Sequence, residues 1–262
     1  MLDVAPRCSL AGTTPPVSGE GAVQLVGAEG LVRALSTLDG QRFALVGGLA
    51  VMARIGRVHR ATEDLDGVFD NDSSTPTTAL LVDTGHATPD AAPQRVLIAG
   101  TTIDVIDTAP LPQDPALLPD DPGPRLFVCA HRFAYETASP VAISAGTSAV
   151  DPRVATVAAL IAMKAHALRF GHPRRRSTKR VSDLADLHRL AAMVDPSSVT
   201  RELGTTAWRL DRQVRDALAE DVMSDPELAV ALLRRSAVPE IASTDPDDFV
   251  ETIGALVEAL GA

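Results

Sequence analysis

Two aspartates one residue apart, Asp64 and Asp66, follow a pair of glycines, Gly47 and Gly48, at a short distance in the chain. In an extended strand alternate side chains point to the same face, so we expect both carboxylates on one side and Leu65 in the core. Carboxylate oxygens in this arrangement suit Mg²⁺, which usually binds substrate phosphates at the same time. The pattern therefore predicts a magnesium site that acts on a phosphorylated substrate.

The elements around the glycine pair predict a phosphate site beside this metal site. Phe43–Val46 is an apolar run typical of a buried strand, and a helix is expected to begin with Leu49–Arg54. At the turn between them a residue without a side chain lets a phosphate approach the free N–H groups of the helix N-terminus. Taken alone, the glycines also fit an ordinary tight turn, and the aspartates an exposed strand end.

The stretch 43–69 resembles the DNA-polymerase-β-like nucleotidyltransferases, in which a hydrophobic run, Gly-Gly or Gly-Ser, a spacer and Asp-hydrophobic-Asp occur in this order. It is most similar to the AbiEii branch, the toxins of type IV toxin–antitoxin systems, which include the MenT toxins. That branch favours Gly-Gly and a hydroxyl residue two places before the first aspartate, where Thr62 stands. The resemblance implies that Gly47, Gly48 and Thr62 bind the nucleotide, although Thr62 also fits as a plain strand residue.

The resemblance also implies a fold and a third carboxylate. The fold is α+β, with a mixed β-sheet flanked by helices and a C-terminal helical domain. The third carboxylate of the family lies on a hydrophobic-Asp-hydrophobic strand, and Asp104 fits because Gly100 divides residues 95–106 into a β-hairpin. Asp107 is the second choice, since it precedes Thr-Ala-Pro as a strand end would. By resemblance Asp104 is the general base, and two Mg²⁺ ions, or alternatively Mn²⁺, are bound.

Further matches follow downstream. The helix expected over 153–170 carries Lys164 in an apolar stretch, and Asp-Leu-Ala-Asp-Leu begins at Asp183. The family has a lysine on such a helix, a basic connector and an Asp-Leu-x-Asp-Leu helix start, so the resemblance spans roughly residues 43–190. It implies that Lys164 contacts the triphosphate and that Asp186 serves the active site. Snorkelling of the lysine and capping by one aspartate are the alternatives. The implied catalytic set is Asp64, Asp66, Asp104, Lys164 and Asp186, of which the first three bind metal.

The net charge of the chain does not indicate an RNA acceptor, but the clustering of its basic residues does. The net charge of −10 excludes a uniformly basic surface, yet residues 169–180 contain six Lys or Arg. Such a segment can hold RNA phosphates, although a solvated loop is the alternative. Aromatic residues make up only 3% of the chain, so recognition is expected through phosphates and shape rather than stacking on aromatic residues. The expected acceptor-binding residues are Arg174, Arg175, Arg176 and Lys179.

Length and composition predict a cytoplasmic protein with two domains, or with one domain and a helical extension. The 262 residues are 45% hydrophobic, and two cysteines exclude a disulfide framework or a zinc quartet. We expect no membrane contact, because apolar runs approaching 20 residues and a signal-peptide pattern are absent from the sequence. The expected organisation is a disordered lead at 1–20, a nucleotidyltransferase domain at 21–148 and a helical domain at 149–262.

Hydrophobic periodicity, together with the Gly and Pro residues that interrupt helices and strands, predicts the remaining elements. A helical pattern covers 22–39, a short helix is expected near Thr77–Val82, and Pro110–Pro124 is expected to be an irregular loop. Phe127–Val128 and Val141–Ile143 are expected to add strands. Asp151 before Pro152 is expected to cap the first C-terminal helix. Asp-Pro pairs separate further helices, expected at 153–170, 182–194, 206–220, 225–236 and 247–260.

These observations predict a metal-dependent nucleotidyltransferase toxin that transfers nucleotides from NTP to RNA, with the tRNA 3′ end as acceptor and a cognate antitoxin as a further partner. Two alternatives remain open. One is transfer to a protein or an aminoglycoside, and the other is a non-catalytic nucleotide-binding module.

Overall fold

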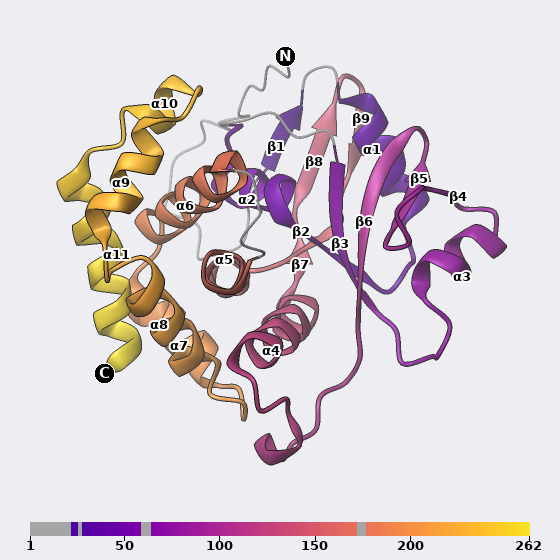
Figure 1. Ribbon diagram of the computed structural model, residues 1–262. Helices are drawn as coiled ribbons and strands as arrows, with labels where there is room; N and C mark the ends of the chain where they lie inside the picture. The colour runs from indigo at the N-terminus through magenta and orange to yellow at the C-terminus, as the bar shows by residue number, and fades with distance from the viewer. Residues whose placement is uncertain (1–21, 26–27, 59–63, 172–176) are drawn as a thin grey trace, which may run out of the picture. The chain divides into compact units, whose positions relative to one another are not determined.

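The computed structural model describes residues 22–25, 28–58, 64–171 and 177–262. These form two compact units, which we call the strand unit (up to residue 110, with 132–156) and the helical unit (111–131 with 157–262). The described strands all belong to the strand unit, whereas helices make up the helical unit (Figure 1). Thr62 and the arginines at 174–176 lie outside the described residues.

A mixed sheet of seven strands forms the strand unit. Its order is β4-β5-β6-β3-β2-β10-β7, in which β3 runs parallel to β6 and antiparallel to β2. A second sheet has the order β1-β8-β9. The bounds are β1 (Ala22–Leu25), β2 (Phe43–Val46), β3 (Asp64–Asp70), β4 (Thr88–Pro89), β5 (Arg95–Ile98), β6 (Thr101–Thr108), β7 (Ser139–Pro140), β8 (Ala142–Ala145), β9 (Ser148–Val150) and β10 (Arg153–Val154).

The helices α1 (Glu29–Thr37), α2 (Gly47–Ile55) and α3 (Thr77–Asp83) accompany these sheets. Helix α2 packs on β2 and β3 and is buried from Gly48 to Arg54. The buried Arg54 donates hydrogen bonds to the carbonyl of Ala155 and to Ser139 Oγ, both at 2.8 Å. Because these partners follow β10 and begin β7, Arg54 joins α2 to that edge of the sheet.

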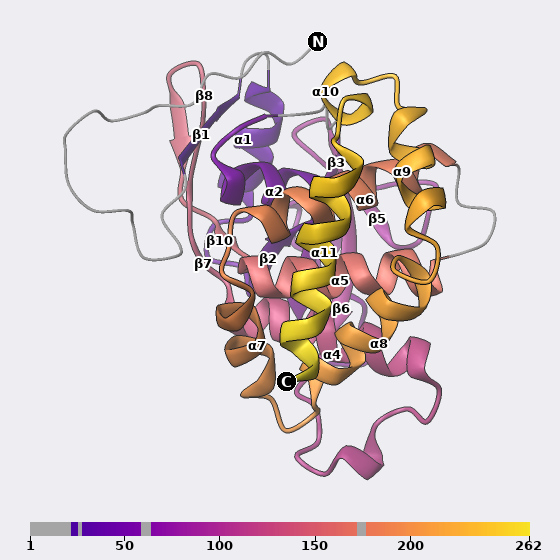
Figure 2. The ribbon, with the colours of Figure 1, turned by 90° about the vertical axis from the view of Figure 1, so that its left-hand side faces the viewer.

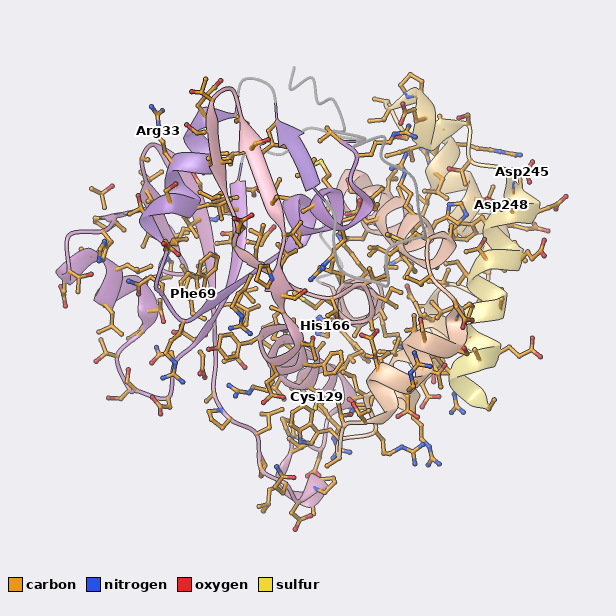
Figure 3. All side chains as sticks on the ribbon, turned by 180° about the vertical axis from the view of Figure 1, so that it is seen from behind. Arg33, Phe69, Cys129, His166, Asp245 and Asp248 are labelled. Atoms are coloured by element: carbon orange, nitrogen blue, oxygen red, sulfur yellow. The ribbon has the colours of Figure 1, made fainter. Side chains whose placement is uncertain are left out.

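The helical unit is built around α5 (Val157–Phe170), which packs against α6 (Ser177–Ala192) and α8 (Leu210–Asp221). Helix α11 (Pro246–Gly261) crosses α6, α7 (Pro196–Gly204), α8 and α9 (Pro226–Arg234) (Figure 2). The unit also contains α10 (Pro239–Ala242), η1 (Pro115–Leu117) and the first part of α4 (Pro122–Thr137). Cys129 of α4 and His166 of α5 belong to it (Figure 3).

Asp-Pro pairs separate the C-terminal helices, as the sequence predicts. Asp195, Asp225 and Asp245 are the N-caps of α7, α9 and α11, and each is followed by proline. Each carboxylate accepts a hydrogen bond from a backbone N–H of the first turn, for instance from Leu228 N to Asp225 at 3.0 Å. The caps satisfy donors that have no partner inside the helix.

The α+β fold class is confirmed, and so is the hairpin of β5 and β6, which turns at Gly100 with φ of +79°. Several local predictions are wrong. The helical pattern at 22–39 contains the strand β1 before α1, and Phe127–Val128 lies inside α4. Asp151 caps no helix, because β10 follows it and α5 begins only at Val157. For β1 and β10 a pairing with a distant strand overrides the local signal.

The loop prediction for Pro110–Pro124 is wrong in part, because η1 lies within it and α4 begins at Pro122. The helix expected at 206–220 begins later, since α8 starts at Leu210. Residues 111–131 group with the C-terminal helices, so the two units are not contiguous in sequence, whereas the sequence predicts one boundary at 148–149.

Candidate active site

The Asp pair lies on one face of β3, in the middle of the sheet. Asp64 and Asp66 are half-buried, whereas Leu65 between them is 1% exposed. This alternation is the one expected of a strand with one face in the core. Asp66 stands opposite Val46 on β2 and opposite Asp104 on β6. The register therefore brings the third predicted carboxylate to the strand next to the Asp pair.

The turn before α2 is fitted closely to Asp66. Gly47 has φ of +67°, a conformation that L side chains rarely adopt. A Cβ on Gly47 would collide with the Asp66 carboxylate and lie 2.8 Å from the Asp66 Cβ. Val46, the N-cap of α2, contributes no side-chain cap. A carboxylate is thus held directly against the first residue of a helix, and only glycine leaves it room.

Asp104 is bound to a neighbour that sequence analysis missed. Arg95 stands opposite it across the β5–β6 hairpin. The Arg95 guanidinium donates through Nε to one carboxylate oxygen and through Nη2 to the other, at 3.1 Å. Asp104, and after it Asp64, raise the pKa of Arg95. The signal was available in the sequence, because Arg95 and Asp104 are equally distant from the Ala99–Gly100 turn.

The described residues contain no group of three Asp, Glu, His or Cys side chains arranged to hold a metal ion. One physical reason is visible at Asp104, whose two oxygens are already engaged by Arg95. Asp64 and Asp66 are hard oxygen donors on one strand face, and this donor type fits a divalent cation. Asp104 would join them only by exchanging Arg95 for a cation.

Asp107 has a different role from the one considered in the sequence. It lies an odd number of residues from Asp104 on β6, so its side chain points to the opposite face. Its carboxylate accepts a hydrogen bond from the backbone N–H of Thr77 at 3.1 Å, at the start of α3. Asp107 therefore supports a helix N-terminus and is excluded as the third carboxylate of this face.

Lys164 and the aspartates of α6 form a buried cluster within the helical unit. The Lys164 ammonium lies 2.7 Å from Asp183 Oδ1 and 2.7 Å from Asp186 Oδ2. Lys164 is 6% exposed, and Asp186 is fully buried. Snorkelling is therefore wrong, because the lysine is paired inside the protein. Capping is also wrong, since α6 begins at Ser177 and both aspartates lie inside the helix.

Part of the basic segment can be placed. Lys179 is exposed on α6. Arg180 is bound within the helical unit, where it donates to the Leu168 carbonyl at 2.8 Å and to Asp221 at 2.7 Å. The predicted acceptor-binding role of Lys179 is compatible with its exposure. The arginines at 174–176 lie outside the described residues, so their predicted role stays a prediction.

The mixed sheet presents carboxylates beside a Gly-Gly turn, as the resemblance to nucleotidyltransferases leads us to expect. Comparison with protein families agrees, because the family described as nucleotidyl transferase AbiEii toxin, type IV TA system, matches residues 31–259. The match covers most of the chain. This chain therefore belongs to the AbiEii family of nucleotidyltransferase toxins, and the family implies a nucleotide substrate and an antitoxin partner.

Two solved structures illustrate the similarity. An antigenic nucleotidyltransferase-like protein from Paracoccidioides brasiliensis has 17% identity and a TM-score of 0.46, and the alignment covers 78% of this chain and 91% of that one. JHP933 from Helicobacter pylori has 16% identity and a TM-score of 0.41, with 89% of each chain covered. The family assignment rests on the family match and not on these scores. No curated protein matches the chain.

Among the described residues, helices long and apolar enough to cross a membrane are absent.

Proposed function

We propose that this protein transfers a nucleotide from NTP to an RNA acceptor in a reaction that depends on a divalent metal, with the 3′ end of tRNA as the acceptor. Family membership supplies nucleotidyl transfer and the toxin class. The observation that carries the metal-dependent proposal is the placement of Asp66 against Gly47 at the start of α2.

This placement suits a cation and a phosphate together. The N-terminus of a helix attracts anions through its free N–H groups and its dipole. Asp64 and Asp66 next to it attract cations. A triphosphate with a bound divalent cation carries both charges, so such a ligand matches the two halves of the site at once. Asp64 and Asp66 would hold Mg²⁺ or Mn²⁺, which when bound neutralises the triphosphate and polarises its α-phosphoryl group.

The roles of the other residues follow from their chemistry. The Gly47–Gly48 backbone would hold the phosphates that leave as pyrophosphate. Asp104 would accept a hydrogen bond from the acceptor hydroxyl and take its proton. The acceptor oxygen then forms a bond to the α-phosphorus while the bond from that phosphorus to the bridging oxygen breaks. No side chain of the protein needs to form a covalent intermediate.

Lys164, Asp186 and Thr62 enter this proposal through the family resemblance. A lysine contributes a point charge to phosphate binding. In the helical unit this charge is balanced by Asp183 and Asp186, so its loss is expected to affect folding as well as transfer. The two effects must be measured separately for Lys164 variants.

Labelled nucleotides test the proposal directly. The purified protein would be incubated with Mg²⁺, a tRNA pool and each NTP labelled on the α-phosphorus, and in parallel on the γ-phosphorus. We expect the α label to enter RNA and the γ label to leave with pyrophosphate. The Asp66→Asn variant provides the inactive control. Label from the γ position in RNA would show phosphoryl transfer instead and would contradict the proposal.

The acceptor is tested in the same reaction by adding cell lysate protein and an aminoglycoside. Label in protein or in the aminoglycoside, with RNA unlabelled, would replace the RNA acceptor by one of the two alternatives. The basic segment is tested by tRNA binding over a salt series, using a triple Gln variant of the arginines at 174–176. Each lost phosphate contact should flatten the slope of log affinity against log salt by roughly 0.7–0.9.

A further inference from the structure

Arg95 ends a row of side chains on the face of the sheet that carries the aspartates. Asp66 of β3 stands opposite Asp104 of β6, and Asp104 stands opposite Arg95 of β5. Residues directly opposite one another on neighbouring strands project to the same face of a sheet. Strand β4 pairs with Val96 and Leu97, so among the described strands the row ends at Arg95. A positive charge therefore stands beside the carboxylates at the end of their row.

The row places Arg95 on the side of Asp104 away from the glycine turn. Asp66 stands opposite Val46, and Gly47 follows Val46 at the start of α2. In the sheet order β5-β6-β3-β2, Arg95 is one strand from Asp104 and three strands from β2. The proposed reaction has the phosphates of the NTP at the glycine turn and the acceptor hydroxyl at Asp104. Arg95 is then on the acceptor side of the reacting atoms.

The Arg95 guanidinium has donors to spare. A guanidinium carries five N–H groups, and Arg95 uses Nε and Nη2 on the two oxygens of Asp104. Its Nη1 makes no hydrogen bond to the described residues and is not among their buried unpaired atoms, so it reaches solvent. The Arg95 side chain as a whole is 41% exposed. A second anion can therefore bind Nη1 while Asp104 keeps its place.

Asp104 can accept a further hydrogen bond while Arg95 holds it. A carboxylate has about four lone-pair sites, and the guanidinium occupies one on each oxygen. The rigid planar guanidinium would fix a phosphate at one edge and Asp104 at the other. The acceptor that matches this arrangement has a phosphate close to its reacting hydroxyl. In the last nucleotide of an RNA, a single ribose separates the 3′ hydroxyl from the preceding phosphate.

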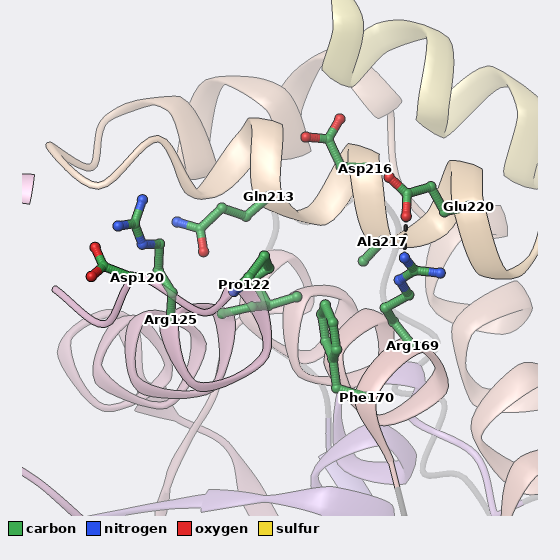
Figure 4. Close-up of a pocket in the computed structure, with 10 residues that line it drawn as sticks. Asp120, Pro122, Arg125, Arg169, Phe170, Gln213, Asp216, Ala217 and Glu220 are labelled. Carbon is green, nitrogen blue, oxygen red and sulfur yellow. Dashed lines mark hydrogen bonds and ion pairs between the residues drawn. The ribbon is translucent and has the colours of Figure 1, made fainter. Parts of the chain in front are cut away.

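The pocket of the helical unit suits an anion less well. This pocket has a volume of about 270 Å³, and Arg125 and Arg169 lie in its walls (Figure 4). Arg169 is paired with Glu220. Asp120 and Asp216 also line the pocket, so its carboxylates outnumber its guanidinium groups. The end of the row in the strand unit is therefore the better place for a phosphate.

We propose that Arg95 binds a phosphate group of the acceptor, next to the hydroxyl that reacts, and so selects an RNA end over an uncharged or cationic acceptor. Arg95 is then an acceptor-binding residue that also positions Asp104. Arginine suits this role because its N–H groups match the geometry of phosphate oxygens. The inference rests on the proposed function and deepens it, because it names the chemical feature that the acceptor must carry.

RNA binding without NTP tests this contact, because no turnover occurs. Fluorescence anisotropy would measure the affinity of a labelled single-stranded oligoribonucleotide over a salt series, with and without Mg²⁺. Loss of one exposed phosphate contact should make Arg95→Gln bind about fivefold more weakly and flatten the slope of log affinity against log salt by about 0.7. Arg95→Lys keeps the charge and should keep the salt slope of the wild type.

The control for this measurement is Arg33→Gln. It removes the same charge at an exposed position of α1, in the same unit, and should bind RNA as the wild type does. If Arg95→Gln matches the wild type in both affinity and salt slope, the proposal is overturned.

A comparison of two acceptors separates this contact from a purely structural role. The kcat/KM for transfer would be measured with the oligoribonucleotide and with a free ribonucleoside, which has the same 3′ hydroxyl and no phosphate. If Arg95 only holds Asp104, Arg95→Gln should slow both reactions by the same factor. The proposed contact should instead lower the preference for the oligoribonucleotide by about fivefold. An unchanged preference would contradict the phosphate contact.

The outcomes also distinguish this inference from the proposed function. Weaker RNA binding by Arg95→Gln, in a protein that transfers no label, would contradict the proposed function and leave the RNA contact of Arg95 intact. Label transfer to RNA with the same acceptor preference in both proteins would overturn the Arg95 assignment alone. If Arg95→Gln weakens NTP binding and leaves RNA binding unchanged, Arg95 contacts the triphosphate, and its assignment to the acceptor is wrong.

Discussion

The carboxylates of the two units differ in burial and in their partners. In the strand unit Asp64, Asp66 and Asp104 lie on neighbouring strands, half-buried and alternating with core residues. In the helical unit Asp183 and Asp186 are buried and paired with one lysine. Carboxylates of the first kind lie partly in solvent, and one of them, Asp104, is bound by Arg95. Those of the second kind share one buried ammonium inside the protein.

This difference separates two kinds of expected effect. A charge kept partly in water costs little folding free energy, so its removal should act mainly on binding and chemistry. A buried charge depends on its partner, so removing one member should act strongly on stability. Variants in the two units can therefore distinguish a reacting site from a structural cluster.

The largest effect is expected for Asp66→Asn. Loss of one anionic ligand beside the helix N-terminus should lower nucleotidyl transfer by roughly 1,000-fold, because metal-assisted charge stabilisation contributes several kcal/mol. The folding midpoint in urea should change little. Asp107→Asn is the matched control on β6, since Asp107 supports α3 on the opposite face. It should keep its transfer rate and change stability little, because an asparagine oxygen can still accept from Thr77 N. Equal transfer by both variants would remove Asp66 from the site.

Lys164→Met should act mainly on stability. It removes the ammonium that binds the buried Asp183 and Asp186, so the free energy of unfolding should fall by about 3–5 kcal/mol. Urea denaturation would measure this loss, and Lys179→Met, at an exposed position of α6, should be nearly neutral.

The same lysine is also predicted to contact the triphosphate, and a combined variant separates the two roles. Lys164→Met together with Asp183→Asn and Asp186→Asn removes these three buried charges together and should regain stability. If Lys164 or Asp186 acts on the nucleotide, transfer by the refolded triple variant stays lost. Recovered transfer would show that the cluster is structural.

Gly47→Ala tests whether the close contact between Gly47 and the Asp66 carboxylate matters for transfer. The positive φ alone should cost about 1 kcal/mol. The added Cβ would also displace the Asp66 carboxylate, and a displacement of this size should lower transfer by about 100-fold. Gly100→Ala carries the same strain, with φ of +79° and no atom within 4 Å of the added Cβ. Gly100→Ala should lose stability but keep its transfer rate. Equal transfer rates in Gly47→Ala and Gly100→Ala would contradict the proposed close fit of Gly47 to Asp66.

The helical unit should also respond to acid. His131 is 5% exposed, and burial lowers its pKa to about 4. Between pH 6.5 and pH 4 the unfolded chain binds a proton at this histidine and the folded chain does not. Stability should therefore fall by about 3 kcal/mol as the pH drops through this range, and this contribution should level off below it.

Urea denaturation at several pH values would measure this dependence. His131→Gln should flatten the curve in this range, because the glutamine does not titrate. A wild-type slope in the His131 variant would show that another group titrates.

The sequence predicted the strand unit better near the glycine turn than elsewhere. The segment from β2 to β3 and the hairpin of β5 and β6 are specified by alternation and by glycines with positive φ, which are local signals. Strand β1 was missed because its partner β8 lies more than a hundred residues away. The burial of Lys164 was missed for the same reason. Pairing with α6 is a tertiary event that helical periodicity does not encode.

The smallest effect is expected for Arg95→Gln, and it tests whether Asp104 can bind a metal. The Arg95 side chain is 41% exposed, so losing its ion pair with Asp104 should change stability by less than about 1 kcal/mol. The same change frees both oxygens of Asp104. Without the competing positive charge, a cation near Asp64 and Asp66 should gain about 1 kcal/mol, which corresponds to about fivefold tighter binding.

Titration with Mn²⁺ would measure this gain, with Arg33→Gln as the control at an exposed position of α1. If Mn²⁺ binds the wild type and Arg95→Gln equally, Asp104 does not contribute to the metal site. The carboxylates of the strand unit would then act as a pair, and Asp104 would be limited to accepting the proton of the acceptor hydroxyl.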